Sequence, residues 1–153
     1  MRIGVFDSRL GGIIVLKELI KYHPKEEYIY VGDNKNLPYG EKSKDELLRL
    51  STKIINFLIE KKVDLILIAC GTVSSNIYDE LKEKYKIPIF NIIDTTVIKI
   101  QESNIKNLAV LGTPATINTH IFKDKLKNLN VTEISCGAFV SLIEDKMDEK
   151  FKW

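Results

Sequence analysis

The sequence predicts an α/β protein of two similar domains, each a parallel sheet flanked by helices in a flavodoxin-like arrangement, with the second domain incomplete. Short apolar runs alternate with amphipathic helical stretches along the chain. The unbroken apolar run from Leu65 to Ala69 is typical of a strand buried on both faces of a parallel sheet. A strand, a Gly-Thr turn and a helix follow one another twice, at residues 71–72 and 112–113. We therefore place a first domain at residues 1–98 and a partial second domain at 99–153.

The first domain is predicted to hold four strands in the spatial order 2-1-3-4, joined by right-handed crossovers. A glycine-rich turn, Asp7 to Gly12, separates the first strand from the first helix. Ser43 and Glu46 have the spacing of a capping box at the start of another helix. The expected strands are 2–6, 27–32, 63–69 and 87–93, and the expected helices are 13–22, the stretch from Ser43 onward, and 73–85.

The second domain is predicted to contain the same alternation of strands and helices in a shorter stretch of chain. The expected elements are helices at 95–102 and 117–129 and strands at 108–111 and 131–135, the last ending at Cys136.

Composition narrows the class of function. The chain has 153 residues, is 44% hydrophobic and carries a net charge of +2 without a basic stripe, so we expect neither a nucleic-acid nor a membrane partner. Two cysteines and no apolar run of transmembrane length favour a reduced, cytoplasmic setting. His23 and His120 lie far apart, and Gly11-Gly12 is not a dinucleotide fingerprint, so we expect no metal and no cofactor.

The residues that could act as catalytic or binding groups follow the ends of the first and third predicted strands. Ligands of open α/β sheets bind at the carboxyl ends of the strands, and Cys70 and Asp7 both follow such ends. Amides at the start of the next helix would bias the Cys70 thiol toward thiolate, and Ser8 and Thr72 could hold a substrate carboxylate. Two plainer interpretations stay open: Cys70 as a buried small residue, and Asp7 as a helix-capping residue.

Four ordered motifs make the sequence resemble the glutamate racemases of the aspartate/glutamate racemase superfamily. They are Phe6-Asp7-Ser8 with Gly11-Gly12, Tyr30-Val31-Gly32-Asp33 with Pro38-Tyr39-Gly40-Glu41-Lys42, Ala69-Cys70-Gly71-Thr72, and Leu111-Gly112-Thr113 with Ala115-Thr116-Ile117.

The resemblance implies a cofactor-independent enzyme that interconverts L- and D-glutamate, supplies D-glutamate for peptidoglycan, and uses two cysteines on opposite faces of the substrate. It implies that Cys70 is one acid/base, Asp7 its carboxylate partner and Glu144 the acid that supports the opposite cysteine. The residues implied to contact substrate are Asp7, Ser8, Pro38, Tyr39, Gly40, Gly71, Thr72 and, from the second domain, Thr116. The implied partner is glutamate itself, and a homodimer is the candidate assembly.

Three departures from the family pattern keep other functions open. Gly71 stands where the family has an asparagine, Arg9 stands where it has a glycine, and the Gly-Cys-Thr-His stretch that carries the second cysteine does not occur. Cys136 aligns with a different cysteine, and we interpret it as a buried residue at a strand end. The chain is therefore either a truncated or diverged glutamate racemase, an inactive module that binds acidic amino acids or a protein partner, or an aspartate racemase. We expect Cys70 to be the more reactive thiol, and the chain as given not to racemise glutamate usefully.

Overall fold

A four-stranded parallel sheet forms the centre of the computed structural model, which describes residues 1–139 and 142–143. Its strands are β1 (Arg2–Asp7), β2 (Glu27–Gly32), β3 (Leu65–Ile68) and β4 (Ile89–Asn91), in the order β2-β1-β3-β4. This is the predicted order. The register places Asp7 opposite Gly32, and Phe6 opposite Ile68, so β1 and β3 end side by side.

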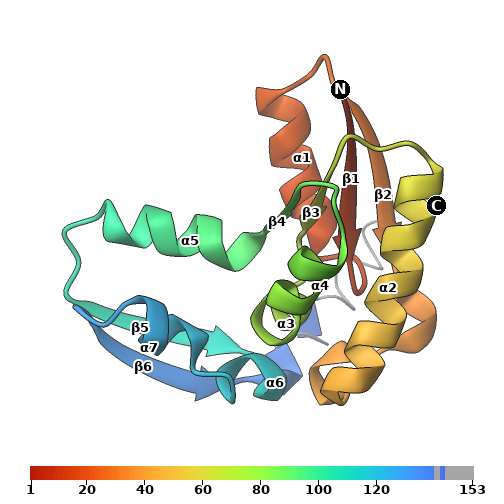
Figure 1. Ribbon diagram of the computed structural model, residues 1–153. Helices are drawn as coiled ribbons and strands as arrows, with labels where there is room; N and C mark the ends of the chain where they lie inside the picture. Colours follow the sequence, from red (N-terminus) through yellow and green to blue (C-terminus); the bar gives the residue numbers. More distant parts are fainter. Residues whose placement is uncertain (140–141, 144–153) are drawn as a thin grey trace.

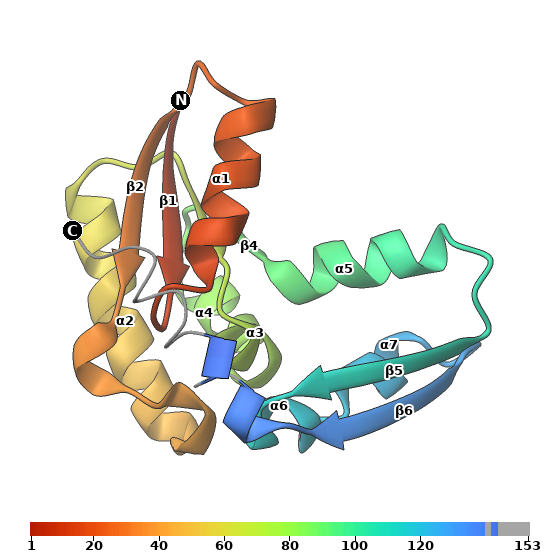
Figure 2. The ribbon, with the colours of Figure 1, turned by 180° about the vertical axis from the view of Figure 1, so that it is seen from behind.

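Helices lie on both faces of this sheet (Figures 1 and 2). One face carries α1 (Gly12–Tyr22), and the other carries α2 (Lys44–Glu60), α3 (Gly71–Asn76) and α4 (Tyr78–Lys84). The main core forms on the second face, where Phe6, Ile66 and Ile68 pack beneath side chains such as Leu58 and Leu81. Two short 3₁₀ turns, η1 (Asn34–Asn36) and η2 (Tyr39–Glu41), occupy the long loop after β2.

The α2 helix begins at the predicted capping box. The Ser43 hydroxyl accepts a hydrogen bond from the Glu46 N–H, and the Glu46 carboxylate accepts one from the Ser43 N–H, each at 3.3 Å. The first turn of α2 therefore has partners for amides that no intrahelical bond would satisfy.

A second, smaller unit contains the parallel strands β5 (Asn107–Gly112) and β6 (Asn130–Ser135). Its helices are α5 (Ile92–Gln101), α6 (Pro114–Ile117) and α7 (Ile121–Lys125). Ile93 and Val97 of α5 form a small core with Leu126. In Figure 1, β5 and β6 lie below α5. The division that we predict between residues 98 and 99 falls inside α5 and stays a prediction.

The strand predicted at 63–69 is Leu65–Ile68, the helix predicted at 95–102 is Ile92–Gln101, and three further elements differ more clearly from the structure. The helix predicted at 73–85 is two helices, because the backbone at Ile77 (φ −140°, ψ 11°) leaves the helical region. The helix predicted at 117–129 is also two, α6 and α7, separated by His120 in the left-handed region (φ 53°). The fourth strand is shorter than 87–93, because the Asn91 side chain accepts a hydrogen bond from the Asp94 N–H (2.8 Å) and caps α5.

None of the helices in the described part of the chain combines the length and the apolar character that a membrane crossing requires.

Candidate active site

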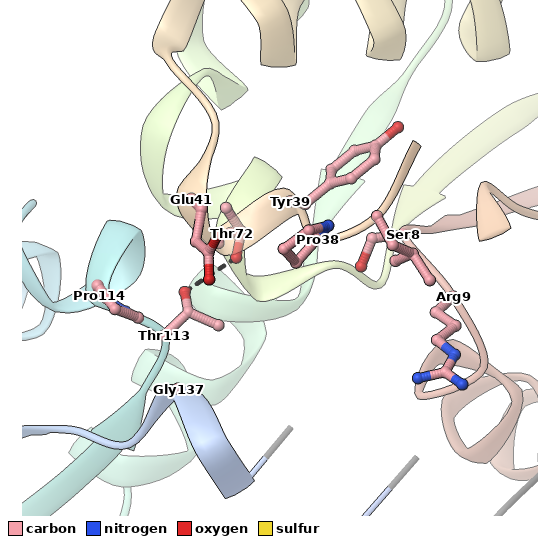
Figure 3. Close-up of a pocket in the computed structure, with 11 residues that line it drawn as sticks. Ser8, Arg9, Pro38, Tyr39, Glu41, Thr72, Thr113, Pro114 and Gly137 are labelled. Atoms are coloured by element: carbon pink, nitrogen blue, oxygen red, sulfur yellow. Dashed lines mark hydrogen bonds between the residues drawn. The ribbon is translucent and has the colours of Figure 1, made fainter. Parts of the chain in front are cut away.

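The carboxyl ends of β1 and β3 face the second unit across two adjoining cavities of about 350 and 360 Å³. Both cavities are lined by Ser8 and Thr72 of the first unit and by Thr113 of the second. The first is also lined by the predicted residues Pro38, Tyr39 and Gly40 (Figure 3), and the second by Asp7, Cys70, Gly71 and Thr116. The structure thus brings these predicted site residues together at one cleft. Glu144 lies outside the described residues, and the role of every one of them stays a prediction.

Asp7 holds the turn that precedes α1. Its buried carboxylate accepts hydrogen bonds from the backbone N–H of Gly12 (2.7 Å) and of Arg9 (3.4 Å). A side chain at Gly12 would place its Cβ 2.6 Å from the Asp7 Cβ, so only glycine fits there. Asp7 is not the N-cap residue of α1, because that position is Gly11 and makes no side-chain cap hydrogen bond, but its carboxylate binds the amide of the first helical residue, Gly12. The same carboxylate also influences Cys70.

Cys70 is a protonated thiol at neutral pH. Burial and then the charge of Asp7 raise the pKa of Cys70 to about 11, although hydrogen bonds from the Ser8 hydroxyl and from the amides of Val73 and Ser8 act in the opposite direction. The prediction of a thiol biased toward thiolate is wrong for this structure. The physical reason is that the side chain is only 3% exposed and stands beside a carboxylate, and together these outweigh the amides at the start of α3.

The Tyr39 hydroxyl is committed to a partner outside the cavity. It donates a hydrogen bond to Asp33 Oδ2 (2.7 Å), and Asn36 Nδ2 donates to both oxygens of the same carboxylate at 2.9 Å. Burial and the Asp33 carboxylate raise the pKa of Tyr39, so the hydroxyl keeps its proton. Figure 3 shows this hydroxyl directed away from Thr72, so Tyr39 offers the cavity its ring.

Two glycines of the site differ in the space around them. A Cβ at Gly40 would lie 2.8 Å from the Thr113 Cβ, so this glycine permits the first unit to approach the second closely. A Cβ at Gly71 would meet nothing within 4 Å, so this position has room for a side chain.

Thr113 is the residue that sequence reasoning missed. Its hydroxyl lies 3.0 Å from the Thr72 hydroxyl and 3.0 Å from the Thr116 hydroxyl, and it lines both cavities. Figure 3 shows the Thr72–Thr113 contact bridging the two units. The available signal was the repeated Gly-Thr turn at residues 71–72 and 112–113, because two equivalent turns can meet at one cleft.

Arg9 and Glu41 also line the first cavity, and the Arg9 backbone is anchored by the Tyr30 hydroxyl, which donates to its carbonyl (2.7 Å). In the described part of the chain, no three His, Cys, Asp or Glu side chains are grouped as metal ligands would be.

Fold and site together define a class: α/β proteins with a thiol, a carboxylate and several hydroxyls at the carboxyl edge of a parallel sheet, facing a second α/β unit. Comparison with known sequences then shows that residues 14–148 match the family described as Asp/Glu/Hydantoin racemase, and the chain belongs to this family.

The relatives include the glutamate racemase of Fusobacterium nucleatum, which is 46% identical over 96% of this chain and 58% of its own length. Among solved structures, glutamate racemase from Aquifex pyrophilus matches with a TM-score of 0.86 and 36% identity, over 97% of this chain and 60% of that protein. Glutamate racemase from Francisella tularensis, solved in complex with D-glutamate, matches with a TM-score of 0.85 and 37% identity, over 94% of this chain and 56% of that protein. The chain thus spans a little under two thirds of the length of these relatives.

Proposed function

We propose that this protein is a glutamate racemase and that Cys70 is the acid/base for one face of the substrate. The observation that carries the proposal is the position of Cys70, buried beside Asp7 at a cleft whose opposite wall presents threonine hydroxyls. The names of the relatives support glutamate as the substrate.

In the proposed reaction the Cys70 thiolate removes the α-proton of glutamate. The electron pair of the broken C–H bond moves into the substrate carboxylate, and donors such as the Ser8 and Thr72 hydroxyls stabilise the charge that develops there. Cys70 keeps that proton as a thiol, and a second acid on the opposite face of the α-carbon donates a proton there to give the other enantiomer. Because Asp7 helps to raise the pKa of Cys70, a substrate ammonium group placed near Asp7 would offset that effect and favour the thiolate.

Incubation with each glutamate enantiomer in deuterated water tests this proposal. Deuterium at the α-carbon, read by mass spectrometry and chiral chromatography, separates exchange from inversion. We expect exchange of one enantiomer that Cys70→Ser abolishes, with little interconversion, because Cys70 is the one thiol among the described residues that line the two cavities. Efficient interconversion would show that a second acid/base acts from the other face. Exchange that survives in Cys70→Ser would contradict the assignment of Cys70, and faster exchange of aspartate would contradict the assignment of glutamate.

Two observations favour one alternative, an inactive module that binds acidic amino acids. The pKa of Cys70 is raised, and Gly71 has no side chain that could contact a substrate. Calorimetric titration with glutamate separates the two functions. Binding without any exchange would support the module, and binding with exchange would support the enzyme.

The wider role that we propose is the supply of D-glutamate for peptidoglycan in the cytoplasm, by a homodimer that needs no nucleic acid or membrane partner. Because we expect little interconversion by this chain, rescue of a bacterial strain that depends on added D-glutamate would support the role and contradict that expectation; light scattering tests the assembly.

A further inference from the structure

The hydroxyl of Thr113 can donate only one hydrogen bond, although it has two hydroxyl neighbours. A threonine hydroxyl has one proton and two lone pairs. One lone pair of Thr113 already accepts the Thr116 N–H (3.2 Å), which leaves one proton and one lone pair for Thr72 and Thr116, both at 3.0 Å. One of these two threonines must therefore donate to Thr113, and the other must accept from it.

This count permits two opposite directions of donation. If Thr72 donates to Thr113, its own proton is used and none is left for a ligand. If Thr116 donates to Thr113 and Thr113 donates to Thr72, the proton of Thr72 is free to point into the cavities that it lines. An anion beside Thr72 attracts that proton and so selects the second direction, and each bond of such a chain strengthens the next.

We propose that Thr113 is a positioning residue for the substrate: by donating to Thr72 Oγ1, its hydroxyl turns the Thr72 proton toward a substrate carboxylate. This inference rests on the proposed function, because it takes glutamate to be the ligand.

Thr113 is held firmly in the place that this role requires. It is the N-cap of α6, and the next residue is Pro114 at the first helical position. Gly40 packs against its Cβ and Cγ2, since a Cβ at residue 40 would lie 2.8 and 3.0 Å from these atoms. Thr72 is also fixed, because its carbonyl accepts hydrogen bonds from Ser75 Oγ (3.1 Å) and Asn76 Nδ2 (2.9 Å). Both hydroxyls therefore meet on rigid backbone, as a preorganised donor needs.

Glutamate binding to Thr113 variants, measured by calorimetry, tests the proposal. Thr113→Val keeps the shape but removes the hydroxyl, and we expect it to weaken binding about 10-fold, because a hydrogen bond that supports a charged contact is lost. Thr113→Ser keeps the hydroxyl and should bind within about twofold of the unchanged chain. The matched control is Thr119→Val, which removes a hydroxyl that donates to the Thr116 carbonyl (2.6 Å) outside both cavities, and it should bind normally.

A double-mutant cycle separates positioning from a general structural effect. If Thr113 acts through the Thr72 hydroxyl, Thr113→Val should change binding by less than about twofold when Thr72→Val is already present. Equal losses in both backgrounds, or normal binding by Thr113→Val alone, would overturn the proposal. Absence of glutamate binding by the unchanged chain would overturn the proposed function with it. If Thr113→Val does not fold, Thr113→Cys replaces it, since a thiol is a poor donor of similar size, and normal binding by that variant would also refute the role.

Discussion

Alkylation of Cys70 by iodoacetamide should be slow at neutral pH and should rise about tenfold with each pH unit until the pH approaches 11. Burial and then the Asp7 charge raise the pKa of this thiol from 9.0 to about 11. At pH 8 a thiol with a pKa of 11 is about 0.1% thiolate, whereas one with a pKa of 9 is about 10% thiolate. Because the thiolate is the reactive form, the site should slow labelling roughly a hundredfold, before any effect of poor access.

Asp7→Asn isolates the electrostatic part of this effect. The variant removes the charge but keeps an oxygen that can accept the Gly12 N–H, so the rate at pH 8 should rise roughly 3- to 10-fold. The rate should stay below that of an ordinary thiol, because burial is the larger cause and remains. Mass spectrometry of the Cys70 and Cys136 peptides at timed intervals gives both rates, with the more accessible Cys136 as internal standard.

We therefore expect Cys136 to react faster than Cys70 at pH 8, the reverse of the order that the sequence favours. Faster labelling of Cys70, a rate that does not change with pH, or slower labelling in Asp7→Asn would each refute the reasoning.

Four other variants test the packing and the linkage. Gly12→Ala should lower the free energy of unfolding by about 1–3 kcal/mol, because its Cβ would lie 2.6 Å from the Asp7 Cβ. Gly71→Ala should leave the free energy of unfolding equal or raise it by up to about 1 kcal/mol, because nothing lies within 4 Å of a Cβ there. Urea titration compares the two variants. Ser43→Ala should cost about 1 kcal/mol by the same measurement, and unchanged stability would mean that the capping box contributes nothing. Between pH 9 and 11 the folded Cys70 thiol keeps a proton that the unfolded chain loses, so roughly 2–3 kcal/mol of stability should disappear as the pH rises, and Cys70→Ser should lack that part of the slope.

The strands and their order could be predicted, because the spacing of apolar residues and the residues of the turns are read from short stretches of the sequence. Glu27–Gly32 has the predicted bounds, and the capping box at Ser43 marks where α2 begins. Helix breaks could not be predicted in this way. Ile77 follows Asn76, whose amide donates to the carbonyl of Ala115 (3.2 Å) in the other unit, so a contact between distant segments accompanies the break.

Some features of the candidate site could likewise be predicted from the sequence, and others could not. The meeting of Asp7 and Cys70 was predictable, because parallel strands deliver both to one edge, whereas Tyr39, Gly40 and Thr116 were expected there only from the family resemblance. The protonation state of Cys70 was not, because it depends on how deeply the thiol is buried and on the carboxylate beside it. Thr113 was not predictable either, since its importance comes from its distances to two other hydroxyls.

The contact between Thr72 and Thr113 joins segments that are 41 positions apart in the chain. Thr113 follows β5 directly, and the unit that contains it has a much smaller core, formed by Ile93, Val97 and Leu126, than the first unit. A unit with few buried apolar contacts opens more readily than its neighbour. Each transient opening of the second unit therefore also withdraws Thr113 and Thr116 from the cleft. Ligand occupancy and amide hydrogen exchange in β6 then report on one equilibrium, so an anion held at Thr72 slows exchange in a strand whose residues line neither cavity.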